Sequence, residues 1–177
     1  MKTDNIERFL KSFGKYIIKQ SRTNLTKGKK NVTKDLYDSL NFKIITDNKG
    51  FTIEFSMAEY GTFVDKGVSG NQNKRQYKDY MGKKVPSPYK YTTRQPPSGI
   101  LEKWISARGL KGRDARGRYI TNKSFAFLIA RSIKAKGIKG ISFFQRPMEL
   151  GLKRFGSDLL NALKGDISES LNKTIVK

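Results

Sequence analysis

The acidic side chains are the groups in this sequence best suited to chemistry, and they are few and scattered. Asp35 and Asp38 are spaced by one helical turn, which lets two carboxylates face the same cation. No second acidic cluster follows that would complete a magnesium site with them. Glu54 and Glu59 have no evident partner that would set up acid–base catalysis. The acids therefore predict neither a catalytic pair nor a metal site.

The sequence contains neither histidine nor cysteine. Their absence removes the commonest zinc ligands, the Ser–His and Cys–His nucleophile pairs, the usual general base and all thiolate chemistry. We expect a protein that is not an enzyme, with no cofactor and no small-molecule substrate. No run of about 18 apolar residues occurs and the first residues lack the apolar segment of a signal peptide, so we expect no membrane partner.

Basic residues supply the other candidate chemistry. The chain carries 37 Lys and Arg against 15 Asp and Glu, a formal net charge of +22, and residues 66–146 hold 20 of these basic residues but only three of the acidic ones. A charge this concentrated favours a polyanionic or acidic neighbour. The plain alternative is a lysine-rich solvated surface, because charge governs solubility and partners rather than fold.

The densest basic segment is residues 108–118, which glycines interrupt. A flexible cationic loop suits contact with phosphate groups, and a disordered surface turn fits the same composition. The glycine spacing is not that of a nucleotide phosphate loop, because no Gly-Lys-Ser/Thr follows and no strand precedes it. The candidate polyanion contacts are Arg108, Lys111, Arg113, Arg116 and Arg118.

Residues 67–97 are rich in glycine, asparagine, lysine and tyrosine and contain four prolines, which indicates a long loop or an extended arm. Aromatic rings interleaved with cations suit single-stranded nucleic acid. They suit a protein–protein interface equally well, because Tyr and Arg are enriched there. The candidate subunit-interface or arm residues are Tyr60, Phe63, Tyr77, Tyr80, Tyr89 and Tyr91.

An amphipathic helix is predicted over residues 4–22, because apolar residues recur there with helical spacing. Its basic face suits solvent, with a membrane surface as the alternative. A polar connection over 23–34 and one helical turn over 35–40 follow. Strands are predicted over 42–46 and 51–57, and a helix must cover this hairpin because a lone hairpin is not stable in water.

Three further helices are predicted over residues 98–108, 124–136 and 147–165. The last of them ends at Gly165, and Ile167 and Leu171 continue as a shorter helical tail. Ser98 and Asn122 are the candidate caps of the first two. The join between those two is too long for the compact turn of a helix-turn-helix. Their apolar stripes include Ile100, Leu101, Trp104, Ile105, Phe125, Leu128, Ile129 and Ile133.

The 177 residues thus predict a single α+β domain. A small antiparallel hairpin at about 41–57 is packed by an N-terminal helix and a C-terminal helix. The expected core comprises residues 4–67 and 141–165, and a long basic helical and loop insertion occupies 68–140.

Two short segments suggest a family. Ala58-Glu-Tyr-Gly-Thr-Phe-Val-Asp-Lys-Gly67 follows the hairpin as an aromatic turn that ends at an acid and a glycine, and Phe143-Phe-Gln-Arg-Pro147 opens the last helix. They resemble the signatures of phage head–tail connector and tail-completion (neck) proteins of the minor tail protein Z-like kind. The resemblance covers roughly residues 4–67 and 141–165. Gly61 and Met148 stand where that family has alanine.

The resemblance implies a structural virion protein, made in the host cytoplasm, that forms a homo-oligomeric ring between the portal or adaptor and the tail. It brings no catalytic residues. The implied partners are further copies of the chain, other neck, portal or tail proteins, and the DNA that passes through this conduit. The charge alone offers an alternative, a basic nucleic-acid-binding protein that uses residues 66–146.

Overall fold

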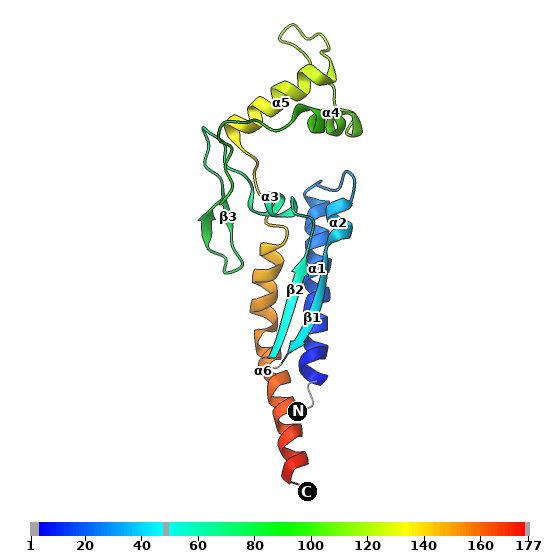
Figure 1. The fold of residues 1–177 in the computed structure, drawn as a ribbon, viewed down its shortest axis with the longest axis vertical. Coiled ribbons are helices and arrows are strands. Elements are labelled where there is room, and N and C mark those ends of the chain that lie inside the picture. The colour runs from blue at the N-terminus through cyan, green and yellow to red at the C-terminus, as the bar shows by residue number, and fades with distance from the viewer. Residues whose placement is uncertain (1–3, 48–49, 176–177) are drawn as a thin grey trace.

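The computed structural model describes residues 4–47 and 50–175 and shows an elongated molecule built on a two-helix stalk (Figure 1). The stalk helices α1 (Asp4–Lys27) and α6 (Gln145–Ile175) run antiparallel. A β-hairpin lies against them, and the chain between this hairpin and α6 extends the molecule away from the C-terminus. The architecture is α+β, with N- and C-terminal helices flanking a hairpin, as predicted.

Aromatic packing and one glycine hold the stalk helices together. The ring of Phe155 on α6 meets Phe13 and Tyr16 of α1 edge-on, at centroid distances of 6.0 and 5.1 Å. Gly151 lets the helices approach, because a Cβ there would lie 2.8 Å from Cδ1 of Ile17. Edge-to-face aromatic pairs at these distances add to the stability gained from burial.

The predicted break at Gly165 is wrong, because α6 runs without interruption through the predicted tail to Ile175. The residue after the glycine explains the difference. Asp166 is fully buried, and its carboxylate accepts hydrogen bonds from the backbone N–H groups of Asn5 and Ile6 at 3.2 and 3.0 Å. Because these N–H groups belong to the first turn of α1, which has no intrahelical acceptors, tertiary contact outweighs the low helix propensity of glycine.

The first hairpin pairs β1 (Asn41–Asp47) with β2 (Gly50–Ser56) in antiparallel register, with Phe42 opposite Phe55. It lies against α1, where Gly14 makes room for it. A Cβ on Gly14 would come within 2.4 Å of the Phe42 ring. The main core cluster lies between this hairpin and the helices and is formed by the buried residues Ile18, Leu25, Leu36, Leu40 and Phe143.

Helix α1 is longer than predicted, and the expected polar connection over residues 23–34 is correspondingly shorter. Leu25 gives the physical reason, since its side chain is fully buried in the core and holds the helix in place for another turn. The short helix α2 (Asp35–Ser39) then returns the chain to β1, close to the predicted turn over 35–40.

The aromatic turn after β2 forms the helix α3 (Gly61–Lys66), which ends at Gly67 as predicted. Gly61 is buried at its start. A Cβ at Gly61 would lie 2.7 Å from Sδ of Met57 and 2.8 Å from Cδ1 of Leu36. The absence of a side chain at Gly61 therefore allows α3 to pack closely on the core.

Two backbone segments cross where the chain leaves the core and where it returns. Val68 and Ile138 exchange N–H···O bonds of 2.9 and 2.8 Å in an isolated antiparallel bridge. Gly67 and Gly140 touch there, since a Cβ on Gly67 would lie 2.5 Å from the Gly140 nitrogen. Gly67 also has φ 74° and ψ 179°, a backbone region that glycine alone adopts without strain. We call this contact of residues 65–70 with 137–142 the crossing. It forms the base of the excursion, which is the segment between these two stretches.

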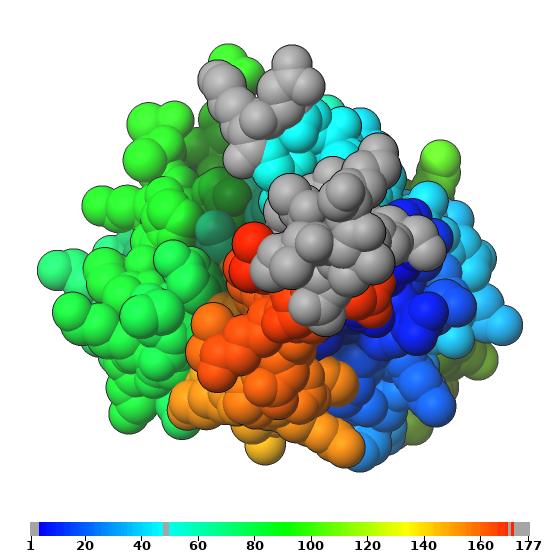
Figure 2. Space-filling view, turned by 90° about the horizontal axis from the view of Figure 1, so that it is seen from below, coloured from blue at the N-terminus to red at the C-terminus, as the bar shows by residue number. Residues whose placement is uncertain are grey.

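The segment 67–97 is not simply a loop or free arm as expected. It contains a second hairpin, in which β3 (Gln76–Lys78) pairs with β4 (Lys84–Pro86). The Asp79 carboxylate closes its turn by accepting from the backbone N–H groups of Met81 and Lys83 at 2.9 and 2.8 Å. The view along the stalk in Figure 2 shows this region, in green, on one side of α6, in orange. Helix α1, in blue, lies on the other side of α6.

The remaining helices, α4 (Ser98–Ala107) and α5 (Asn122–Lys136), pack on each other at the far end of the molecule (Figure 1). The predicted caps are wrong by one residue. Pro97 precedes α4 without a side-chain cap, and Thr121, whose backbone is extended, accepts from Ser124 N at 3.2 Å. Asn122 is already helical and leaves the capping position to Thr121.

The apolar stripes expected on these two helices are only partly buried. Ile105, Ala126 and Ala130 are fully buried. Ile100 is 68% exposed and Leu128 51% exposed. The small alanine side chains let the two helices approach closely, and this turns part of each predicted stripe toward solvent.

Candidate assembly and polyanion-contact surfaces

Asp65 links the two segments that carry the family resemblance. Its buried Oδ1 accepts hydrogen bonds from the backbone N–H groups of Phe144 at 2.8 Å and Gln145 at 3.4 Å, at the start of α6. Its own carbonyl accepts from Ser142 N at 3.0 Å. Burial raises the pKa of the Asp65 carboxyl, and the hydrogen bonds from Phe144 and Gln145 offset part of that rise. The residue fastens α3 to the last helix.

The candidate arm residues contact the base of their own segment. The ring of Tyr89 meets Phe63 edge-on at 4.5 Å, and the Tyr77 ring lies 5.8 Å from Nζ of Lys66. Ser69 donates its N–H to the Tyr89 carbonyl and accepts from Tyr91 N. The segment therefore folds back on residues 63–69 and does not extend freely into solvent.

Exposure separates the six candidates into two groups. Tyr77, Tyr89 and Tyr91 are half-buried within the chain. Tyr60, Phe63 and Tyr80 are exposed, and Tyr80 adjoins Met81, which is 70% exposed. The second group presents aromatic area that a neighbouring molecule can cover, which is the stronger position for an interface residue.

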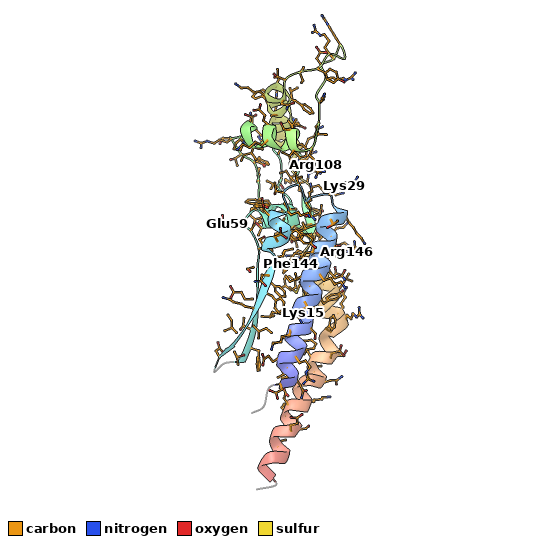
Figure 3. The ribbon with its side chains drawn as sticks, turned by 90° about the vertical axis from the view of Figure 1, so that its right-hand side faces the viewer. Lys15, Lys29, Glu59, Arg108, Phe144 and Arg146 are labelled. Atoms are coloured by element: carbon orange, nitrogen blue, oxygen red, sulfur yellow. The ribbon has the colours of Figure 1, made fainter. Side chains whose placement is uncertain are left out.

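The structure brings four of the five candidate polyanion contacts together. Lys111, Arg113, Arg116 and Arg118 lie on the loop between α4 and α5, at the end of the molecule opposite to the C-terminus (Figure 1). We call residues 109–121 the tip. Arg108 lies at its base and donates a hydrogen bond to the Lys29 carbonyl, beside which Figure 3 shows it. Arg108 therefore contacts the body of the molecule as well as facing solvent.

The tip is an ordered turn. Asp114 accepts from Arg116 N, Arg118 N and Arg118 Nε, each at 2.9 Å. Gly117, with φ 79°, completes the turn by donating to the Asp114 carbonyl at 2.9 Å. The hydrogen bond from the Arg118 backbone N–H is the main cause that holds the pKa of Asp114 below its usual value. This ionised carboxylate orders the cations around it.

The exposure of an apolar row on α6 is a feature that sequence reasoning missed. Leu160, Ile167 and Leu171 are 59, 46 and 57% exposed, and their spacing of seven and four places them on one face. The apolar spacing along the sequence predicted the helix and its tail. The same spacing does not reveal whether an apolar row packs against another part of the chain or stays exposed.

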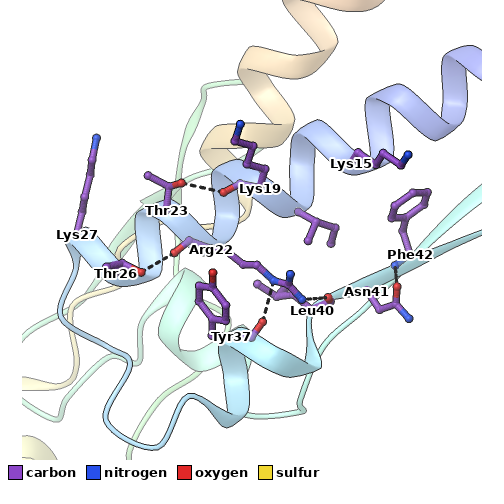
Figure 4. Close-up of a pocket in the computed structure, with 11 residues that line it drawn as sticks. Lys15, Lys19, Arg22, Thr23, Thr26, Lys27, Tyr37, Leu40, Asn41 and Phe42 are labelled. Carbon is purple, nitrogen blue, oxygen red and sulfur yellow. Dashed lines mark hydrogen bonds between the residues drawn. The ribbon is translucent and has the colours of Figure 1, made fainter.

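A groove beside α1 was also missed (Figure 4). It encloses about 720 Å³ and has a cationic rim that includes Lys15 and Lys19, above apolar residues that include Phe42. Nε and Nη2 of Arg22 each donate to a backbone carbonyl, of Tyr37 and Leu40, at 3.1 Å. The groove forms because α2 and β1 return past α1, an arrangement that residue spacing within α1 does not reveal.

The acids considered from the sequence do not gather. Within residues 4–47 and 50–175 no group of three Asp or Glu side chains lies close enough to hold a metal ion. In the same residues no helix is both long and apolar enough to cross a membrane.

No protein-family model matches the chain, and comparisons with characterised proteins and with solved structures find no match.

Proposed function

We propose that this chain is a structural protein of a phage neck or head–tail junction, and that it forms a homo-oligomeric ring between the portal or adaptor and the tail. In this role it resides in the virion and acts by binding other chains. Its partners are further copies of itself and the neighbouring neck, portal or tail proteins.

One observation supports the proposal most strongly. The two segments that resemble neck proteins are 76 residues apart, from Gly67 to Phe143, yet they meet at the hydrogen bonds of Asp65 to Phe144 and Gln145. The acid of the first segment thus caps the helix that the second segment opens. Both short segments therefore contribute to one contact, which fastens the start of α6 to α3.

The exposed apolar surface also favours assembly. Monomeric proteins seldom leave large contiguous apolar patches in water. Here the row Leu160, Ile167 and Leu171 lies on the stalk, and Ile100, Trp104 and Phe127 are exposed at the far end. A ring subunit needs two complementary surfaces for its neighbours, because head-to-tail contacts close into rings.

The direct test is the oligomeric state of the purified chain. Native mass spectrometry and negative-stain electron microscopy should show one closed assembly with a fixed number of subunits. A chain that remains a single subunit from micromolar to millimolar concentration, and that is absent from purified virions by peptide mass spectrometry, would contradict the proposal.

A further inference from the structure

We infer that the tip, residues 109–121, binds the phosphate backbone of duplex DNA without reading its sequence. The inference rests on the proposed function in one respect, because it names the partner of the basic middle in a neck protein. The binding surface itself is argued from the charges and contacts of the tip.

Charge at this end of the molecule is nearly all of one sign. Residues 98–136 contain ten Lys and Arg but only two acids, Glu102 and Asp114. Asp114 is already engaged, since its carboxylate holds Nε of Arg118 and two backbone N–H groups. The side chains of Lys111, Arg113 and Arg116 have no ion-pair partner among the residues that the structure describes. Such cations neutralise phosphates and release their counterions.

The tip holds these cations in place without burying them. Tyr119 is 63% exposed, and its ring lies 4.4 Å from the Arg113 guanidinium carbon and 5.8 Å from Nζ of Lys111. Nη2 of Arg113 also donates to the Tyr119 hydroxyl at 2.6 Å. An isolated antiparallel bridge joins the backbones of Arg113 and Tyr119. The loop therefore holds the charges of Arg113 and Lys111 in place, which lowers the entropy lost on binding.

These contacts favour duplex DNA over a single strand. Single-strand sites offer open aromatic faces on which bases stack. At the tip the Tyr119 ring already carries Arg113 and Lys111. The group offered to a ligand is therefore the cation, and phosphates are what a duplex displays on its outside. A turn this small, whose basic side chains are exposed and which presents no helix to a groove, suits backbone contact rather than base readout.

The β3–β4 hairpin provides a matched control. It carries Lys78, Lys83 and Lys84 near its turn, a charge equal to that of Lys111, Arg113 and Arg116. An acid lies beside it, because a Cβ on Gly82 would meet the Glu149 carboxylate. The hydrogen bond from Lys153 is the main cause that holds the pKa of Glu149 below its usual value, and the charge of Lys78 lowers it further. A lysine close to a carboxylate, as Lys78 is, is less available to phosphate.

The test is fluorescence anisotropy of a labelled random-sequence duplex, titrated with the full-length chain at 50 to 200 mM salt. We compare Lys111→Gln/Arg113→Gln/Arg116→Gln with Lys78→Gln/Lys83→Gln/Lys84→Gln. The tip variant should bind about tenfold or more weakly and flatten the salt slope by about 2 to 3, whereas the hairpin variant should stay within about threefold of the parent chain. Arg116→Glu alone, which keeps the Tyr119 contacts, should weaken binding in the same direction.

Three results would overturn the inference. These are equal losses in the tip and hairpin variants, tighter binding of a single strand than of the duplex, and binding of polyglutamate through the tip in preference to DNA. Mass photometry of each variant separates this inference from the ring. If the ring is intact but substitutions in the tip leave the DNA affinity unchanged, only the inference about the tip is wrong. If the chain is a monomer that binds DNA through the tip, only the proposed ring is wrong.

Discussion

Asp65 and Asp166 are both buried, and each accepts hydrogen bonds from backbone N–H groups at the start of a helix far away in the sequence. A carboxylate in this position satisfies N–H groups that have no acceptor within the helix and lies at the positive end of the helix dipole. Asp65 acts on α6 and Asp166 on α1. Asp65 therefore fastens the start of α6 to α3, and Asp166 fastens the start of α1 to α6.

Removing the Asp65 carboxylate should destabilise the chain. Asp65→Ala leaves the N–H groups of Phe144 and Gln145 without their acceptor, and we expect a loss of about 1–3 kcal/mol in the free energy of unfolding. Asp65→Asn keeps an acceptor oxygen and should lose less. Urea denaturation at pH 7 measures both, and equal stability of the alanine variant and the parent chain would show that the bonds contribute nothing.

The same residue predicts a pH dependence. Burial raises the folded-state pKa of Asp65 above the unfolded value of about 3.9, so the folded state binds the proton more tightly. Its contribution to stability is fully present below the unfolded pKa and is lost as pH rises through the folded pKa. The stability of the parent chain relative to Asp65→Asn should therefore fall with rising pH and then level off. A difference that grows with pH would contradict this sign.

At the scale of elements, the sequence predicted the flanking helices and the first hairpin but missed what tertiary contact decides. Alternating apolar residues gave the β1–β2 hairpin, and helical spacing gave α1 and α6. The ends of both helices were wrong because buried Leu25 and Asp166, not local signals, extend them. The tip cations were found from composition alone, and the ring of Tyr119 that organises them was not.

The close contact between residues 65–70 and 137–142 depends on the glycine at position 67. Gly67→Ala should destabilise the chain by about 1–3 kcal/mol, because it places a Cβ against the Gly140 backbone and strains a glycine-only conformation. Gly156→Ala is the control. It lies within α6 with nothing within 4 Å of its Cβ position, and it should stabilise by about 0.5–1 kcal/mol. Thermal melts that move both variants in the same direction would exclude the proposed role of the crossing.

At the scale of the whole molecule, the stalk and the tip have separate surfaces. The stalk exposes an apolar row, and the tip, at the end opposite to the C-terminus, exposes charge (Figure 1). A ring of such subunits would place many tips together. Many weak phosphate contacts would then act as one strong site, since linked contacts bind at a high effective concentration.

The apolar row gives a prediction about assembly. Leu160→Asp/Leu171→Asp should reduce the assembly to single subunits without lowering the melting temperature of the folded chain, because both side chains are already exposed. Val32→Asp/Ile45→Asp removes two exposed apolar residues elsewhere and should leave the assembly intact. Light scattering after size exclusion measures both variants, and unchanged assembly of the first would place the subunit contact on another surface.

The claim that this chain belongs to the neck of a virion is tested most directly by cryo-electron microscopy of purified particles whose genome encodes it. We predict a ring at the head–tail junction into which the α1–α6 stalk and its hairpin fit as repeated copies. A junction fully accounted for by other proteins, in particles that contain none of this chain, would contradict the account.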